Sequence, residues 1–509
     1  MINLVVRFDT LINLLIFLSM VTTITFWAYQ RLRRNLTVSI VPVIVANFIL
    51  LGVWAAVSQI DHDGTEHLHA AWLMSRGFVP YNDFWMHQSP FLWIMLIPLV
   101  KSFEPSPVIF DIIRIISGLV FLLNAYLGWQ IARKAWQDKA RLAVYLLVLS
   151  SAAIGAEYLW LRPDIFMTFF LLAVILISME IPGKRVLPSF LAGIAFSLAA
   201  SFMTKQYFLF FLPLIAVFLG EKRMRTGKLA AYFLGLAVGS LPLLSYLMSH
   251  GIFQDFVFWV FEFNKEIIVF RVFFPFMIGM FAGWGAYRLL KSFRESRRTK
   301  TLLLIVAFCL STLSSLTSTI AVSWGHYLAF WLFLCAIIAS GCPIPEVFER
   351  VSSRVRRAVI IGVFFSLLLI PGIMYVGEFC DKNFPQDKRA VVELMKYCKN
   401  DHCLVFLPLH PVFTYDATRL YSDWQYHYIT RFSPLKQDAM RQGVLKEIMA
   451  SRPAVVVCSF RKKDFVLDLF QKKLISAADY KELVLFFKEN YTRKRIGQEK
   501  YYIRNDKLK

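Results

Sequence analysis

Twelve apolar runs of about 20 residues each fill most of the first three quarters of this 509-residue chain. A helix needs about that length to cross the hydrocarbon core of a bilayer, because each residue advances it by only about 1.5 Å. Hydrophobic residues make up 57% of the chain and charged residues only 18%, which is too apolar for an ordinary soluble domain. The pattern predicts a polytopic α-helical membrane protein with about 12 transmembrane helices. The runs lie near 9–29, 38–58, 108–131, 140–158, 163–181, 187–203, 205–220, 228–248, 272–291, 300–320, 324–341 and 357–377.

The basic residues indicate which loops face the cytoplasm. The chain has 56 Lys and Arg against 34 Asp and Glu, a net charge of +22. One set of alternate short loops holds 23 Lys and Arg and the other set only 7, so the positive-inside rule places the first set in the cytoplasm. The charge therefore sets topology, and no nucleic-acid-binding motif accompanies it. The segments predicted to face outward are 59–107, 158–163, 204–206, 249–271, 321–326 and the tail from 378.

Two of the outward segments are long enough to form secondary structure of their own. Within the first outer loop, 59–107, the stretch Ser89 to Phe103 is apolar but too short to span, so we expect a helix in the membrane interface. The tail, 378–509, reads as a small extracytoplasmic α/β domain that follows a transmembrane domain at 1–377. It has strand patterns at 403–408, 453–460 and the terminal EKYYIRN, and helical spacing at 386–399 and 480–490. In such a compartment Cys398 and Cys403 could pair.

The first outer loop concentrates polar groups that an apolar chain seldom carries. It opens with Asp61, Asp63, Glu66 and His67, and four of the nine histidines lie in 62–87. Ionisable groups at a membrane surface are costly and indicate function. A catalytic metal is the alternative, but the stretch lacks the H-E-x-x-H spacing of zinc hydrolases, so we assign no metal ligands.

Further candidates lie at the other outward edges of the runs. Pro163 suits the first turn of a helix, and Asp164 suits its N-terminus, where the dipole favours a carboxylate; simple stabilisation of that helix is the alternative. Three cationic side chains lie on the same side, where each one alone could be an interfacial anchor. Together they suit a lipid-phosphate head group. These residues are Arg114, Lys205 and His326, the last followed by Tyr327.

The segment 61–100 resembles the first outer loop of GT-C glycosyltransferases, such as dolichyl-phosphate-mannose protein mannosyltransferases and lipid A aminoarabinose transferases. Arg162-Pro163-Asp164 matches the second outer motif of that superfamily, and Lys205-Gln206 and His326-Tyr327 match its weaker later signals. In one departure, His62 separates Asp61 from Asp63, whereas the acidic pair is usually adjacent. The matching residues of the first loop are Asp61, Glu66-His67-Leu68-His69, Ala71-Trp72, Gly77, Pro80-Tyr81, Asp83-Phe84 and His87 to Pro90.

The resemblance implies inverting transfer of a sugar from a polyprenyl-phosphate carrier to an acceptor hydroxyl on the outer face of a bacterial inner or plasma membrane. Asp61 would be the base, with Asp63 or Glu66 as alternatives, and Asp164 would position the acceptor. Binding of the lipid phosphate would involve His67, Arg114, Arg162, Lys205, His326 and Tyr327. The implied partners are membrane lipids, the lipid-linked sugar and a glycan, lipid or protein acceptor. No cofactor is implied, and a divalent cation is not required.

Other classes of membrane protein fit the sequence less well. A lipid or polysaccharide transporter or flippase should show internal repeats and charges near mid-span, which the sequence lacks. An O-antigen ligase would favour a large Arg-rich outer loop late in the chain, and this is missing. A scaffold without enzymatic activity needs no clustered outward carboxylates.

Overall fold

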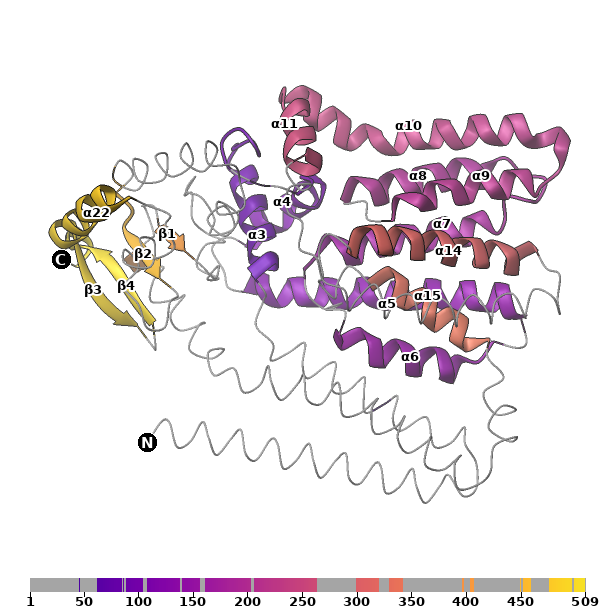
Figure 1. The fold of residues 1–509 in the computed structure, drawn as a ribbon, viewed down its shortest axis with the longest axis horizontal. Helices are drawn as coiled ribbons and strands as arrows, with labels where there is room; N and C mark the ends of the chain where they lie inside the picture. Colours follow the sequence, from indigo (N-terminus) through magenta and orange to yellow (C-terminus); the bar gives the residue numbers. More distant parts are fainter. Residues whose placement is uncertain are drawn as a thin grey trace, which may run out of the picture. The chain divides into compact units, whose positions relative to one another are not determined.

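The computed structural model describes the outer-loop helices, most of the central helices and a C-terminal sheet (Figure 1). Clustering of the chain gives two compact units. The first comprises Met1–Ser58, Arg114–Pro242 and Val269–Asp381, and the second Gln59–Ile113, Leu243–Ile268 and Lys382–Lys509. The described residues are 45, 62–84, 86, 88–103, 108–137, 140–155, 161–202, 206–262, 299–319, 329–341, 396–397, 403–406, 449, 452–458, 476–496 and 499–508.

Apolar helices occupy the positions of eight of the predicted runs. Among the described residues, two stretches, Ile112–Trp136 and Lys222–Ser249, are long and apolar enough to cross a membrane by length and composition. Apart from the helical Val45, the runs at 9–29, 38–58, 272–291 and 357–377 lie outside the described residues, so the total of about 12 spans stays a prediction. The helices are α5 (Val108–Trp136), α6 (Leu142–Gly155), α7 (Pro163–Ser178), α8 (Leu187–Phe202), α9 (Phe211–Phe218, preceded by the 3-10 turn η2, Tyr207–Phe210), α10 (Arg225–Ser249), α14 (Thr299–Thr319) and α15 (Ala329–Ser340).

The helices of the first unit lie side by side as a bundle with a close-packed interior (Figure 1). Phe166 on α7 stacks on Phe202 of α8 with ring centroids 5.6 Å apart. Glycines let α8 and α10 approach closely, since a Cβ on Gly235 would meet the backbone carbonyl oxygen of Phe190 at 2.0 Å. Small residues at a helix contact are typical of membrane bundles.

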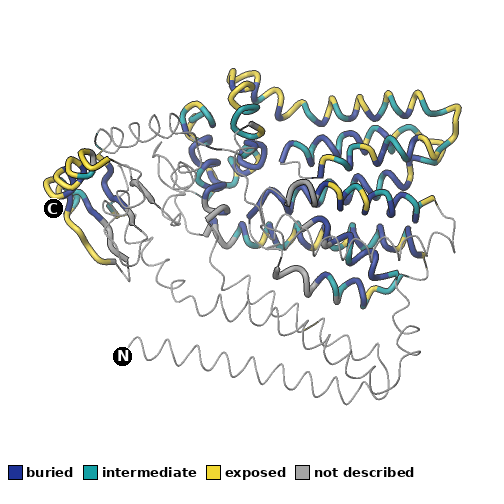
Figure 2. Tube along the Cα trace, viewed as in Figure 1, coloured by how far each residue is buried: buried dark blue, intermediate teal, exposed yellow. Residues whose placement is uncertain are grey.

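The outward faces of this bundle are apolar. Figure 2 shows α10 exposed along much of its length, and Phe233 and Leu234 of this helix are more than half exposed. On α5, Ile115 and Leu122 are exposed to a similar degree. Apolar faces of this extent are costly in water but not in hydrocarbon, so they fit a membrane-embedded bundle.

In the second unit, α3 (His62–Ser75) packs against α4 (Phe91–Phe103). Gly77 ends α3 in the left-handed conformation, with φ of 91°. The amide of Phe78 then donates to the carbonyl of Leu73 and that of Gly77 to Met74, which is the Schellman pattern. The expected helix at 89–103 exists as α4; its place in the membrane interface stays a prediction.

The C-terminal residues form a mixed four-stranded sheet with the order β1-β2-β4-β3. β1 (Cys403–Phe406) pairs parallel with β2 (Val455–Cys458), and β4 (Glu499–Arg504) pairs antiparallel with both β2 and β3 (Tyr491–Ile496). The strands expected at 403–408, 453–460 and the terminal segment occur as β1, β2 and β4, and the helix expected at 480–490 occurs as α22 (Ala477–Asn490). β3 was not expected from the sequence.

Two predictions about this tail are not decided by the described residues. The division into domains at 1–377 and 378–509 stays a prediction. Of the helix expected at 386–399 only 396–397 is described, and it is helical, while Cys398 lies outside the described residues.

Candidate functional site

Two polar residues of α3, Glu66 and His67, are buried within the second unit. Glu66 and His67 are each only 2% exposed, and Leu68, Ala70 and Ala71 beside them are fully buried. Burying a carboxylate in such surroundings costs free energy relative to leaving it in water. A buried carboxylate is therefore expected only where its charge or its hydrogen bonds have a use. Of the two other acids of this stretch, Asp63 lies in the first turn of α3, and Asp61 lies outside the described residues.

A hydrogen bond between α4 and α3 determines how His67 can act. The indole Nε1 of Trp93 lies 2.9 Å from His67 Nδ1, and both residues are buried. An indole N–H can only donate, so Nδ1 accepts and the ring proton must lie on Nε2. His67 is thus held as a neutral imidazole with its proton on Nε2.

The Pro-Tyr and Asp-Phe pairs of the first loop build a closed turn between α3 and α4. Asp83 Oδ2 accepts from the backbone amide of Val79 at 2.8 Å, and Pro80 bridges to Phe84. Tyr81 has a φ of 69°, which is strained for a residue with a side chain, and its hydroxyl donates to the carbonyl of Gln88 at 2.5 Å. Burial, with a smaller contribution from Tyr246, raises the pKa of Tyr81 well above its ordinary value, so this donor stays protonated.

The second candidate segment forms the start of α7 as the sequence predicted. Arg162 is the N-cap residue with extended backbone, Pro163 is the first helical residue, and Asp164 lies in the first turn. Arg162 and Asp164 are each only 4% exposed. The Arg162 side chain makes no hydrogen bond that caps the helix. The helix dipole stabilises the Asp164 carboxylate where it lies.

Asn124 on α5 holds this turn and was missed by the sequence reasoning. Its Nδ2 donates to the carbonyl of Ile165 at 3.0 Å, and the side chain is fully buried. The signal that could have found it is the occurrence of a lone amide within the apolar run 108–131, because a polar residue in a span usually faces the bundle interior.

Arg114 lies on the same helix as Asn124 but at a different level. The two residues are ten positions apart, so they are separated by roughly 15 Å along the axis of α5. Arg114 is partly buried, and Ser117 and Asn124 follow it on one face of the helix. Arg162, in contrast, is two residues from Asp164, which makes it the cation of this bundle that is nearest to that carboxylate in the chain.

The remaining candidates are described only in part. Lys205, His326 and Tyr327 lie outside the described residues. Gln206, next to Lys205, is 1% exposed, and the amide of Phe208 donates to Ser314 of α14 at 3.2 Å, so this turn is bound to the bundle. Glu66 and His67 belong to the second unit, and Arg162 and Asp164 to the first. Their convergence in one site stays a prediction.

Among the residues that the structure describes, no group of three or more His, Cys, Asp or Glu side chains could hold a metal ion. His69, one of the loop histidines, stacks on Trp72 with ring centroids 6.1 Å apart.

Comparison with solved structures identifies the fold. The chain is similar to ArnT from Cupriavidus metallidurans bound to undecaprenyl phosphate, with a TM-score of 0.55 and 12% identity over 91% of this chain and 97% of that one. ArnT in the apo state gives a TM-score of 0.54 at 12% identity, over 92% and 98% of the two chains. An Archaeoglobus fulgidus oligosaccharyltransferase tethered to an acceptor peptide with the NVT sequon gives 0.50 at 9% identity, over 94% and 75%.

No protein-family model matches the sequence, and no match is found among curated proteins. The structural likeness nevertheless extends over nearly the whole length of both ArnT structures. The GT-C fold predicted from the resemblance in 61–100 is therefore confirmed, and the chain has the architecture of a polytopic membrane protein.

Proposed function

We propose that this protein is an inverting glycosyltransferase that moves a sugar from a polyprenyl-phosphate carrier to an acceptor hydroxyl. The observation that carries the proposal is the full-length likeness to ArnT, which was solved with undecaprenyl phosphate. The buried acids of α3 and α7 support it, since a fold alone does not require charge in these places.

In the proposed reaction a carboxylate of the first outer loop acts as general base. Asp61 accepts the proton of the acceptor hydroxyl while the oxygen attacks the anomeric carbon, and the bond from that carbon to the phosphate oxygen breaks. Asp63 and Glu66 are the alternatives for this role. Attack from the face opposite the leaving phosphate inverts the anomeric configuration.

Cationic and hydrogen-bonding groups would stabilise the departing polyprenyl phosphate. We assign this role to Lys205, His326 and Arg162, with Arg114 further along α5 and with Tyr327 beside His326. His67 would add one neutral donor, because Trp93 donates to its Nδ1 and the ring proton therefore lies on Nε2. Asp164 would position the acceptor. A phosphomonoester leaving group carries modest charge, so a divalent cation is not required.

The proposed site faces away from the cytoplasm, in the inner or plasma membrane of a bacterium. The charge bias of the loops, 23 basic residues against 7, supports this orientation. The acceptor class is a glycan, a lipid or a protein, and the sugar is a hexose or a pentose.

The test is mass spectrometry of envelope glycans and glycolipids from a strain that lacks the protein. Loss of one sugar from one class of molecule is expected, and the wild-type gene should restore it. Asp61→Asn should fail to restore it although the variant reaches the membrane in normal amount. Asp255→Asn, which changes an exposed acid of α11 (Phe253–Val257), is the matched control and should restore it fully.

Two results would count against the proposal at different levels. If the deletion strain keeps every sugar, the assignment as a transferase is wrong. If Asp61→Asn restores the sugar, the transferase remains but the base must be sought at Asp63 or Glu66.

A further inference from the structure

The edge strand of the C-terminal sheet is strongly basic. β3 is the outermost strand, paired only with β4 among the described strands, and its residues Thr492, Arg493, Lys494 and Arg495 are all exposed. From 488 to the C-terminus the chain carries eight Lys and Arg against three Asp and Glu. A single Lys is enough to discourage edge-to-edge pairing of strands, so three successive cations exceed what that purpose needs.

The cations of β3 project from both faces of the strand. Neighbouring residues alternate in direction, so Arg493 and Arg495 point to one face and Lys494 to the other. Arg493 lies 5.9 Å from the ring centroid of Tyr502, and Lys494 donates to the hydroxyl of Tyr397 at 2.7 Å. Contacts with aromatic rings orient the cations without cancelling their charge.

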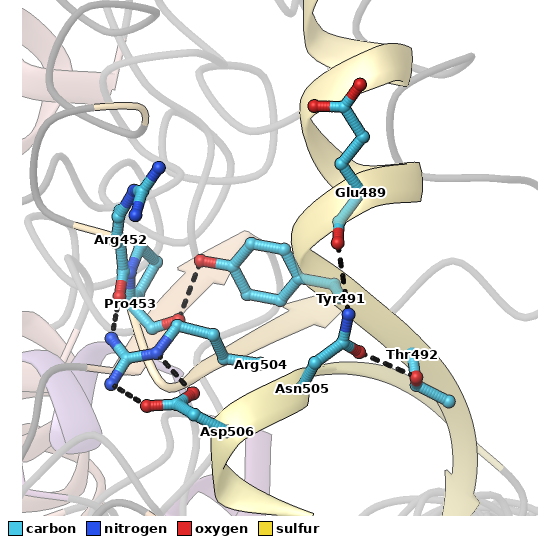
Figure 3. A network of polar contacts seen from close by, with 8 residues as sticks. All are labelled: Arg452, Pro453, Glu489, Tyr491, Thr492, Arg504, Asn505 and Asp506. Carbon is cyan, nitrogen blue, oxygen red and sulfur yellow. Dashed lines mark hydrogen bonds and ion pairs between the residues drawn. The ribbon is translucent and has the colours of Figure 1, made fainter.

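Hydrogen bonds among residues 452–453, 489–492 and 504–506 form a frame around the start of β3 and the end of β4 (Figure 3). Arg504 of β4 holds Asp506 through two hydrogen bonds of 2.7 and 3.0 Å and also donates to the carbonyl of Arg452. At the start of β3 the hydroxyl of Tyr491 donates to the carbonyl of Pro453 at 2.7 Å. Asn505 links the two ends of the hairpin, donating to the carbonyl of Glu489 at 3.1 Å and accepting from Thr492 at 2.7 Å.

This frame also engages one of the few nearby acids. Asp506 is committed to Arg504, whose hydrogen bond lowers the pKa of that carboxyl. Its charge therefore pairs within the frame, and Arg493, Lys494 and Arg495 are exposed at the edge of the sheet.

From this surface, defined by Arg493, Lys494 and Arg495, we propose that β3 docks on the anionic head groups of the membrane that carries the protein. The sheet is tethered to a membrane-embedded bundle, so lipid phosphates are the anions present at the highest local concentration. Each Lys or Arg near an anionic surface favours docking by about fivefold, so Arg493 and Arg495, which point to the same face, together shift the balance by roughly 25-fold at low salt. The side of the membrane rests on the proposed function, whereas the docking itself does not.

The experiment uses the full chain in nanodiscs of phosphatidylcholine alone or with an anionic phosphatidylglycerol fraction. Hydrogen exchange of the amides at 491–496 is measured by mass spectrometry, and exchange at 455–458 in β2 reports whether the sheet is intact. We expect exchange at 491–496 to slow roughly tenfold or more in the anionic discs. The slowing should vanish in about 1 M salt, where the screening length is only about 3 Å.

The double variant R493E/R495E should lose the slowing while β2 keeps its protection. K222E/R223E makes the same change in charge at two exposed residues of the first unit and should leave the slowing intact. Equal exchange of wild-type protein in neutral and anionic discs would overturn the proposal. If the double variant unfolds the sheet, the salt dependence of the wild type decides the question.

This outcome can be separated from that of the proposed function. If β3 docks but the deletion strain loses no sugar, the docking proposal stands and the proposed transferase activity is wrong. If the deletion strain loses a sugar but β3 does not dock, the transferase activity stands and the docking proposal is wrong.

Discussion

The two ends of α7 hold their charged residues in opposite ways. At the N-terminal end Arg162 and Asp164 are each 4% exposed, within the bundle. Just beyond the C-terminal end, the side chain of Glu180 is 46% exposed and binds Lys134, with Lys300 3.6 Å away. Exposed ion pairs contribute about 0–1 kcal/mol, whereas buried charges carry a desolvation penalty. The exposed end therefore fits a structural role, and the buried end is the one to which the proposed function assigns a part in the reaction.

One cation near the exposed end is buried, and its contacts explain why. Lys228 of α10 is fully buried and donates to the carbonyls of Ile181 and Gly183 at 2.8 and 2.5 Å. Its ammonium group thus satisfies backbone carbonyls of the turn after α7. Burial alone therefore does not identify a catalytic charge; the partners of the group must be considered too.

The largest effect is expected from Asp164→Asn. The amide keeps the size of the side chain but removes the charge, so sugar transfer should fall about a hundredfold, or roughly 3 kcal/mol in the barrier. Thermal stability should change by less than about 1 kcal/mol. The transfer rate of the purified Asp164→Asn variant is measured against that of a control, Glu221→Gln, which changes an exposed acid of the same unit. A normal rate of sugar transfer by Asp164→Asn would contradict a role of this end of α7 in the reaction and leave it only a structural role.

An intermediate effect is expected from Asn124→Leu. The variant loses the hydrogen bond to the carbonyl of Ile165 and frees the first turn of α7 to shift, so transfer should fall roughly tenfold. The cost in stability should be only about 0.6 kcal/mol, as for other hydrogen bonds between membrane helices. Ser117→Ala, on the same face of α5, is the control and should leave transfer unchanged. A large loss of stability with normal kinetics per folded molecule would contradict a positioning role.

The smallest effect is expected from Glu180→Gln at the exposed end. The hydrogen bond from Lys134, then the charges of Lys134 and Lys300, lower the pKa of Glu180 below its ordinary value of 4.5. The ionised form is thus favoured in the folded state, and this stabilisation is complete above pH 4.5 and lost as the pH falls through the lower, folded-state pKa. Because the group is half exposed, the difference at neutral pH should be at most about 0.5 kcal/mol.

Thermal unfolding of wild type and Glu180→Gln at neutral pH and near pH 3 measures this difference, which should shrink at the lower pH. Transfer activity should be the same in both proteins. A clear loss of activity in Glu180→Gln would remove the functional distinction between the two ends of α7.

The parts of the site that could be predicted are those that local rules control. A proline followed by an acid after an extended residue begins a helix by its own backbone preferences, and Pro163-Asp164 does so. The hydrogen bonds from Trp93 to His67 and from Asn124 to Ile165 join residues 26 and 41 positions apart. No local sequence pattern predicts such pairs, because they depend on how whole helices pack against one another.

In the C-terminal sheet, too, some strands could be predicted from local sequence and one depends on pairing with its neighbour. β1 and β2 are short apolar runs with β-branched residues, which predict buried strands. β3, with the sequence YTRKRI, lacks an alternating apolar face and forms a strand because β4 offers it a partner along its whole length. Pairing with a neighbour can outweigh the propensity of the segment itself.

The sequence by itself predicted a membrane protein, the basic end of each span and the side on which the acids lie, because transfer of side chains between water and hydrocarbon depends on composition and length. Only the tertiary structure decided that Glu66 and Asp164 are buried, that His67 is a neutral donor and that a basic strand forms the edge of the sheet. These features arise from contacts between distant segments, and their free energy exists only once the helices and strands have packed.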